Sequence, residues 1–197
     1  FLQRHNRYTT LAAQELSHPL SLCIALDFTG HVHQFRREVQ AAREQAEAAL
    51  AIAQEQGFPF WEASAMILRG WALALQGHSH EGLTQLREGL VTFRATGAEI
   101  QQPSWLALLA EAYGHVGQID AGLRAVAEGL AVLHQTGERY YEAELYRLRG
   151  ELLWQQPTRQ KWLEAEQSFL QALDIARHQH AKSLELRAAM SQSRLWQ

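Results

Sequence analysis

Apolar positions along this chain recur at a spacing of forty residues. One series of bulky residues consists of Leu26, Met66, Leu106 and Tyr146. A second series consists of Leu86, Val126 and Phe169, with three extra residues before its last member. The repeated segments read as pairs of helices. The first helices are expected at about 60–76, 103–116 and 140–155, and the second helices at about 80–96, 119–136 and 161–179.

Small residues follow the same period inside the expected helices. The three series are Gly30, Gly70, Ala110 and Gly150, then Ala42, Gly82, Gly122 and Ala165, and finally Ala49, Gly89, Gly129 and Ala172. A glycine or alanine in the middle of a helix lets a neighbouring backbone approach closely. Since a single helix pair cannot bury its apolar faces alone, these series predict a stacked array of repeats.

Glycines also mark the expected ends of helices. Gly57, Gly97 and Gly137 close second helices, and Gly77 and Gly117 close first helices. Glycine is the usual residue just past a helix, because it enters the left-handed backbone region without a Cβ penalty. In the fourth unit the longer turn 156–160 replaces the short one, which accounts for the three extra residues.

The order of small, bulky and turn residues resembles the tetratricopeptide repeat. In each unit a bulky residue (Leu73, Tyr113 or Leu153) follows the small residue of the first helix by three positions. The repeat has 40 residues instead of the common 34 and lacks a proline at the unit boundary. The longer form, and the stretch 137–153 above all, is similar to repeats attached to bacterial signal-transduction ATPases, class III adenylate cyclases and maltose-activator-type regulators. This resemblance implies a regulatory or scaffolding segment of a larger protein.

The predicted fold is all-α, a right-handed superhelical solenoid of antiparallel helix pairs. We expect one repeat domain over residues 1–197. Its parts are the second helix of a preceding unit at 1–16, repeats at 17–57, 58–97, 98–137 and 138–180, and the first helix of a truncated fifth repeat at 181–197. A solenoid normally ends in a polar capping helix, whereas Leu195 and Trp196 are apolar. We therefore expect a piece of a longer protein, with self-association through the terminal helices as one option.

Composition supports the helical interpretation and narrows the function classes. The chain has 30 Ala and 29 Leu but six Val and six Ile, so the runs of β-branched residues typical of sheets are missing. The net charge of −3 argues against a nucleic-acid partner or an acidic membrane surface. No apolar run approaches the roughly 18–20 residues that a membrane helix needs. A cytoplasmic location is compatible with the single cysteine, Cys23.

Histidines are the first candidates for metal binding, because three His-x-His triplets occur, at 31–33, 78–80 and 178–180. Ligands two residues apart on a helix point in different directions, whereas the triplet at 78–80, expected in a loop, could chelate. No Cys or acidic cluster accompanies the triplets. Solvated histidines are therefore the favoured interpretation. We expect no metal and no cofactor.

The remaining polar residues also have ordinary interpretations. Glu144 with Arg147, and Arg43 with Glu47, have the spacing of surface pairs on helices. Cys23 is expected to be a buried free thiol. An enzyme would need a converging cluster of titratable groups, which the sequence does not offer. We expect a non-enzymatic protein.

The inner face of the first helices is the candidate binding surface, because in such arrays these helices line a concave groove. Nine inward positions form the candidate site: Asp27, His31, Gln34, Ile67, Trp71, Glu111, Arg147, Glu151 and Trp154. Aromatic residues and Arg dominate binding hot spots, and the small residues Ala74, Ala107 and Gly114 would leave room for a peptide. The alternative is that Trp71 and Trp154 pack against the adjacent unit.

The leading hypothesis is a protein–protein interaction or scaffolding module. It would hold a peptide, or another domain of the same polypeptide, in the concave groove. The alternative is a small-molecule sensor whose ligand binds in the groove and alters the pitch of the superhelix. A ligand-dependent thermal shift would favour the sensor.

Overall fold

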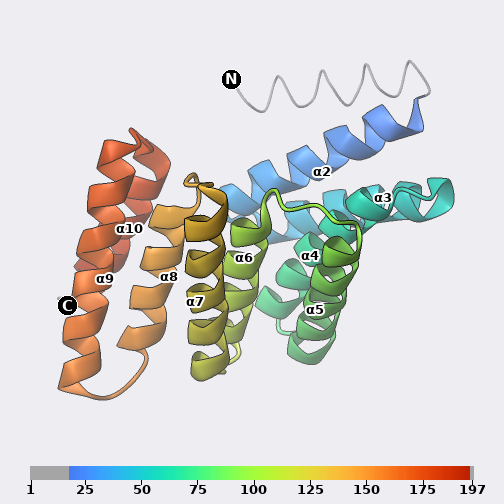
Figure 1. The fold of residues 1–197 in the computed structure, drawn as a ribbon. Coiled ribbons are helices and arrows are strands. Elements are labelled where there is room, and N and C mark those ends of the chain that lie inside the picture. The colour runs from blue at the N-terminus through green and yellow to red at the C-terminus, as the bar shows by residue number, and fades with distance from the viewer. Residues whose placement is uncertain (1–17, 196–197) are drawn as a thin grey trace. The chain divides into compact units, whose positions relative to one another are not determined.

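The computed structural model describes residues 18–195, and every regular element in that range is an α-helix (Figure 1). The helices are α2 (Pro19–Phe35), α3 (Val39–Gln56), α4 (Pro59–Leu75), α5 (Ser79–Ala95), α6 (Gln102–His115), α7 (Ile119–Thr136), α8 (Glu142–Trp154), α9 (Arg159–His178) and α10 (Lys182–Leu195). The prediction of an all-α fold is confirmed. The helix expected before residue 17, and Trp196, lie outside the described residues.

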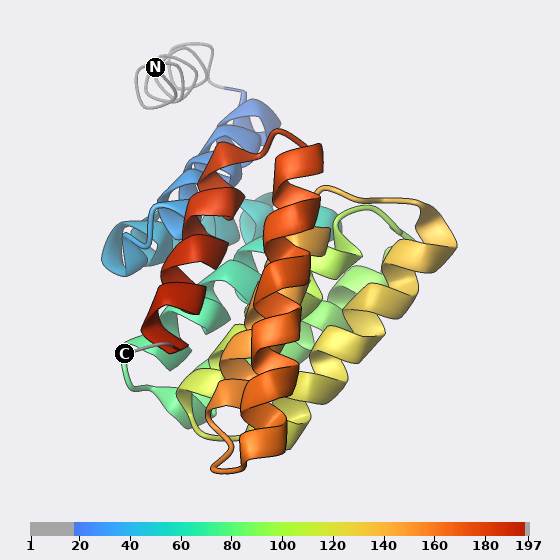
Figure 2. The ribbon, with the colours of Figure 1, turned by 90° about the vertical axis from the view of Figure 1, so that its left-hand side faces the viewer.

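The chain forms two compact units, with the division after Ala98. In unit 1, each of the helices α2 to α5 packs on the next one along the chain, and α2 also packs on α4. In unit 2, α6 to α10 follow the same rule, and the first helices α6, α8 and α10 contact one another in turn. Figure 2 shows α9 and α10 side by side at the end of this unit. Each unit therefore stacks its first helices directly, as a helical-repeat array does.

The small residues lie where helices approach most closely, as predicted. A Cβ atom added at Gly70 on α4 would lie 2.7 Å from the Leu86 nitrogen and 2.8 Å from the Gly82 oxygen, both backbone atoms of α5. A Cβ atom at Gly150 on α8 would lie 2.6 Å from Cδ1 of the Phe169 ring on α9. Glycine is needed at both positions because any larger residue would push the paired helices apart.

The predicted turn glycines all have positive φ angles, between 69° and 93°. Two non-glycine residues adopt this conformation at equivalent places in the repeat. Arg37, forty residues before Gly77, has a φ of 63°, and His180, 43 residues after Gly137, has a φ of 53°. These two turns thus keep the left-handed conformation although another residue replaces glycine, and the side chain causes backbone strain there.

The three extra residues of the fourth unit lengthen a helix more than they lengthen a turn, which corrects the expectation from the sequence. The α8–α9 connection spans 155–158, one residue longer than 76–78 or 116–118. Helix α9 begins six residues before Ala165, whereas α7 begins three residues before the equivalent Gly122. The Thr158 side chain caps this extra turn by accepting a hydrogen bond from the Lys161 backbone nitrogen at 3.3 Å.

The core of each unit is apolar and closely packed. The largest side chains with less than 2% exposed surface include Trp71, Phe93 and Leu86 in unit 1 and Leu145, Leu152 and Phe169 in unit 2. Within the described part of the chain, no helix combines the length and the hydrophobicity that crossing a membrane requires.

Candidate functional site

The nine candidate residues divide into two groups by exposure. Five are buried, namely Asp27, Gln34, Ile67, Trp71 and Arg147, and four keep part of their surface exposed, namely His31, Glu111, Glu151 and Trp154. Two of the small residues expected to leave room for a peptide, Ala74 and Ala107, are buried as well. At Gly114, an added Cβ would lie 2.8 Å from Leu152 Cδ2, so that space is also taken. The role of all nine in binding remains a prediction, and only the second group is accessible in this structure.

In unit 1, α2 carries a buried carboxylate on its inner face. Asp27 Oδ1 accepts a 2.6 Å hydrogen bond from the Ser64 hydroxyl on α4, and Asp27 Oδ2 lies 3.6 Å from His31 Nε2. Burial raises the pKa of Asp27, while the His31 charge and the Ser64 hydrogen bond oppose the rise. Burial also lowers the pKa of His31 against the opposing effect of Asp27. The hydroxyl donates to the carboxylate and not to the imidazole, so this is no nucleophile–base pair.

Trp71 on α4 is part of the core of unit 1. Its side chain has no exposed surface, and the guanidinium carbon of Arg37 lies 5.9 Å from the centre of the ring. A cation over an indole face at this distance is attracted by the ring quadrupole. For Trp71 the structure therefore favours the packing alternative over direct contact with a partner.

In unit 2, α8 carries a buried ion pair where the spacing suggested an ordinary surface pair. Glu144 and Arg147 are 3% and 5% exposed, and Arg147 donates to both Glu144 oxygens, at 2.9 and 2.7 Å. Arg187 of α10 lies 2.7 Å from the same carboxylate. The prediction of a surface pair is wrong here because α10 covers both residues. The i,i+3 spacing along one helix carries no information about which other helix packs over it. The pair Arg43 and Glu47 is partly exposed, as expected.

The polar network continues along α8 to a more exposed end. Glu151 accepts hydrogen bonds from the Ser191 hydroxyl at 2.6 Å and from Arg147 at 3.2 Å, and it pairs with Arg194. Burial alone would lower the pKa of Arg147, but Glu144, with Glu111 and Glu151, raises it above its ordinary value. The network thus joins α8 to α10 through two carboxylates, those of Glu144 and Glu151, and three guanidiniums, those of Arg147, Arg187 and Arg194.

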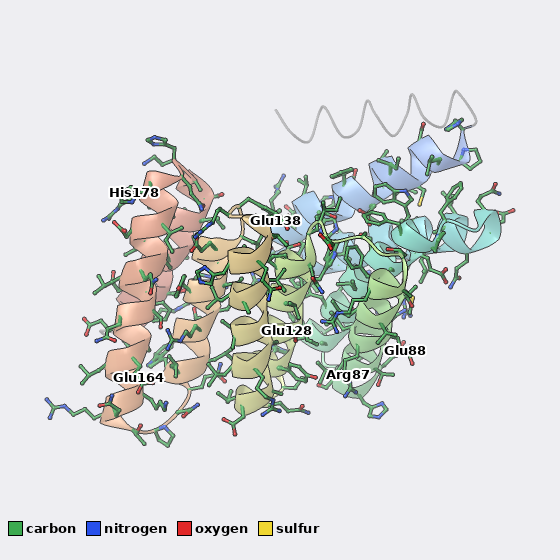
Figure 3. The ribbon with its side chains drawn as sticks, in the orientation of Figure 1. Arg87, Glu88, Glu128, Glu138, Glu164 and His178 are labelled. Carbon is green, nitrogen blue, oxygen red and sulfur yellow. The ribbon has the colours of Figure 1, made fainter. Side chains whose placement is uncertain are left out.

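A pocket of about 320 Å³ opens at the end of α8 and the start of α9. Its lining residues are Trp154, Arg159, Trp162, Leu163, Glu166 and Leu195. Glu164, labelled in Figure 3, marks the same end of α9, and His178 marks the opposite end. Trp162 and Leu163 are 48% and 50% exposed, which is unusual for two adjacent large apolar residues. The sequence pattern identified Trp154 but missed the α9 residues, because they belong to a second helix and not to the inner face of the first helices.

The other candidates from the sequence are the histidines, as metal ligands, and the single cysteine. Among the described residues, no three His, Cys, Asp or Glu side chains come together as a metal site requires. Cys23 is a buried free thiol, as predicted, and donates to the Ala49 carbonyl at 3.5 Å. Burial, with a contribution from Asp27, raises its pKa to about 11, so the thiol is protonated at neutral pH.

Comparison by sequence finds a relative that is much longer than this chain. No known protein-family profile matches the chain. An uncharacterized protein of Rhizobium meliloti (strain 1021) is 30% identical over 130 residues, which are 66% of this chain and 12% of that protein. The chain thus spans 12% of the length of this curated relative.

A solved structure is similar over most of the chain. The crystal structure of aspartyl phosphate phosphatase F from Bacillus subtilis matches with a TM-score of 0.56 at 12% sequence identity, over 90% of this chain and 49% of that one. At this identity the likeness concerns the fold alone. The fold is a tetratricopeptide-like helical repeat.

Proposed function

We propose that this chain is an interaction module that binds a peptide or a neighbouring protein domain, and that it serves as a regulatory segment of a larger bacterial signalling protein. The forty-residue repeats, which resemble those attached to signalling ATPases and cyclases, support this proposal. The much greater length of the Rhizobium relative also supports it. The partner is then either a separate protein or another domain of the same polypeptide.

One observation carries the proposal: two indoles, those of Trp154 and Trp162, line a single open pocket. Trp154 is the last residue of α8 and keeps part of its surface exposed. Exposed aromatic groups next to a rigid helix pair are typical of binding hot spots, because they bury a large area at a small cost in side-chain entropy. The partly exposed Glu151 and the 51%-exposed Arg194 continue this surface along the first helices of unit 2.

The experiment is a selection of random 12-residue peptides displayed on phage against the whole chain. Binding of the selected peptides is then measured for the wild type and for the Trp154→Ala variant. The control variant is Val91→Ala, which removes a 67%-exposed apolar side chain from α5 in unit 1. We expect Trp154→Ala to weaken binding by roughly tenfold or more, as at a hot spot, and Val91→Ala to leave it unchanged. Equal binding by all three proteins would place recognition elsewhere and contradict the proposal.

A further inference from the structure

The pocket at Trp154 lies at an irregularity of the repeat. Arg159 belongs to the extra first turn of α9, and Trp162 stands where α7 has its first residue, Ile119. One lining residue of the pocket, Arg159, therefore has no counterpart in the regular repeat, whereas Trp162 takes the place of Ile119. A feature added to a repeat on one face is often a binding feature.

The charged side chains around the pocket differ in whether they already have a partner within the protein. Within the described residues, Arg159 forms no hydrogen bond and no ion pair, and its side chain is exposed at the pocket rim. It is also the first residue of a 20-residue helix, whose amino end adds positive potential. Lys161, two residues on, is already paired with Glu164 at 2.9 Å. Glu166, the carboxylate of the pocket, is already engaged in an interaction.

The pocket thus has a free cation at one end and an apolar middle. Glu166 lies seven residues after Arg159 on α9, about 10 Å further along the helix axis. Trp162 and Leu163 lie between these two charges, and Trp154 and Leu195 face them from α8 and α10. A ligand that matches this arrangement carries an aromatic or branched apolar group beside a carboxylate, with the carboxylate toward Arg159.

We propose that this pocket recognises a side-chain carboxylate, from Asp or Glu, next to an aromatic or Leu-like residue in the partner segment. This inference rests on the proposed function and specifies the chemistry of the partner at the same site. A guanidinium binds a carboxylate through two parallel hydrogen bonds, which gives direction as well as affinity. The indoles of Trp154 and Trp162 supply the apolar contact.

The first experiment compares the composition of 12-residue peptides selected from the phage library by three proteins. Wild type should enrich an acidic residue next to an aromatic or large aliphatic one. Arg159→Gln should keep the apolar enrichment and lose the acidic one. The matched control is Arg124→Gln on α7, which also removes an exposed arginine without a partner in the described structure, and it should select as the wild type does.

The second experiment measures the energetic coupling. One selected peptide is synthesised with an amidated carboxyl terminus, so that only side-chain carboxylates remain, and again with its acidic residue changed to the amide. The change should weaken binding to the wild type by roughly tenfold, as expected for a charge-assisted hydrogen bond. Binding to Arg159→Gln should stay the same with either peptide.

The outcomes separate this inference from the proposed function. Selected peptides that depend on Trp154 but show no acidic preference would overturn the inference and leave the function standing. Enrichment of Lys or Arg would overturn it in favour of recognition by Glu166. An acidic preference that survives Arg159→Gln, or that disappears when the carboxyl terminus is amidated, would also overturn it. No Trp154-dependent peptide at all would contradict the function itself.

Discussion

The inner faces of α2 in unit 1 and α8 in unit 2 occupy the same place in the repeat and fill it differently. Asp27 and Arg147 both lie three residues before a buried glycine, Gly30 or Gly150. In unit 1 the buried carboxylate is held by a hydroxyl and an imidazole. In unit 2 the buried guanidinium is held by two carboxylates. The repeat thus determines that the position is buried, but the partners have different origins. In unit 1 Ser64 comes from the neighbouring first helix α4, whereas in unit 2 both carboxylates come from α8 itself.

Helix α4 gives a third solution at the same place. Ile67 and Trp71 occupy the positions of Asp27 and His31, and both have no exposed surface. An apolar pair needs no partner of a particular charge, whereas a buried charge needs one. A binding surface cannot therefore be assigned from the inward register alone, because the same register is used for packing.

The largest effect on stability is expected from removing one charged partner of the buried polar network in unit 2. Arg147→Met should lower the free energy of unfolding by about 3 kcal/mol, because Glu144 stays buried with Arg187 as its remaining partner. Asp27→Asn in unit 1 should cost much less, since the amide oxygen can still accept the Ser64 hydrogen bond. Urea unfolding followed by circular dichroism measures both. Similar losses for the two variants would remove the distinction between the units.

The second effect concerns the glycines at which two paired helices approach closely. Gly70→Ala and Gly150→Ala should each destabilise by about 1–3 kcal/mol through overpacking. The added methyl group meets rigid backbone at Gly70 and the Phe169 ring at Gly150. Combining Gly150→Ala with Phe169→Leu should therefore recover part of the loss, whereas Gly70 has no such relief. Thermal unfolding of the three variants tests this, and unchanged melting of Gly70→Ala would show that the repeat register is wrong.

The third effect is a dependence of stability on pH in unit 1. The lowered pKa of His31 means that the unfolded state takes up a proton more readily, so stability should fall as the pH drops below the ordinary value of 6.5. The slope has an upper limit of about 1.4 kcal/mol per pH unit for one proton. The raised pKa of Asp27 acts in the opposite sense, because the folded state binds this proton more tightly and gains stability as the pH falls from the raised pKa toward 3.8.

His31→Gln should therefore flatten the loss of stability between about pH 6.5 and 5. Unfolding in urea at a series of pH values measures this slope. The matched control is His80→Gln, which changes an exposed histidine on α5. If both variants keep the wild-type slope, His31 does not carry the effect.

The smallest effect is a gain. His180→Gly should stabilise unit 2 by about 1 kcal/mol or less, because glycine adopts the positive φ of this turn without strain. Arg37→Gly relieves the same strain but removes the guanidinium over Trp71, so its gain should be smaller. Differential scanning calorimetry resolves the order of the two. A lower melting temperature for His180→Gly would contradict the assignment of strain to this turn.

Much of the fold could be predicted because the repeat is marked by glycines at positions where a larger residue does not fit. Glycine at Gly70 or Gly137 reflects a close approach or a left-handed turn, and both constraints act on the backbone itself. Helix ends predicted from these residues lie within two residues of the observed ones. The extra residues of the fourth unit were harder to place, since Pro157 and Thr158 suggested a longer turn while Arg159 already begins α9.

The candidate site was less predictable, because function depends on which inward residues stay exposed. Trp71 and Trp154 are both inward positions in the sequence pattern, yet one lies in a core and the other borders a pocket. Glu144 and Arg147 have surface spacing, and only the distant Arg187 shows that they are buried. Such distinctions come from contacts between residues about forty positions apart, which a single helix pattern does not contain.

The most direct test of the central claim is to follow the indole N–H signals of the whole chain by nuclear magnetic resonance while a selected peptide is added. Single Trp→Phe variants assign the signals. The account predicts that the Trp154 and Trp162 signals shift together with saturation, while those of the buried Trp71 and Trp105 stay in place. Saturable shifts at Trp71 without shifts at Trp154 and Trp162 would contradict it.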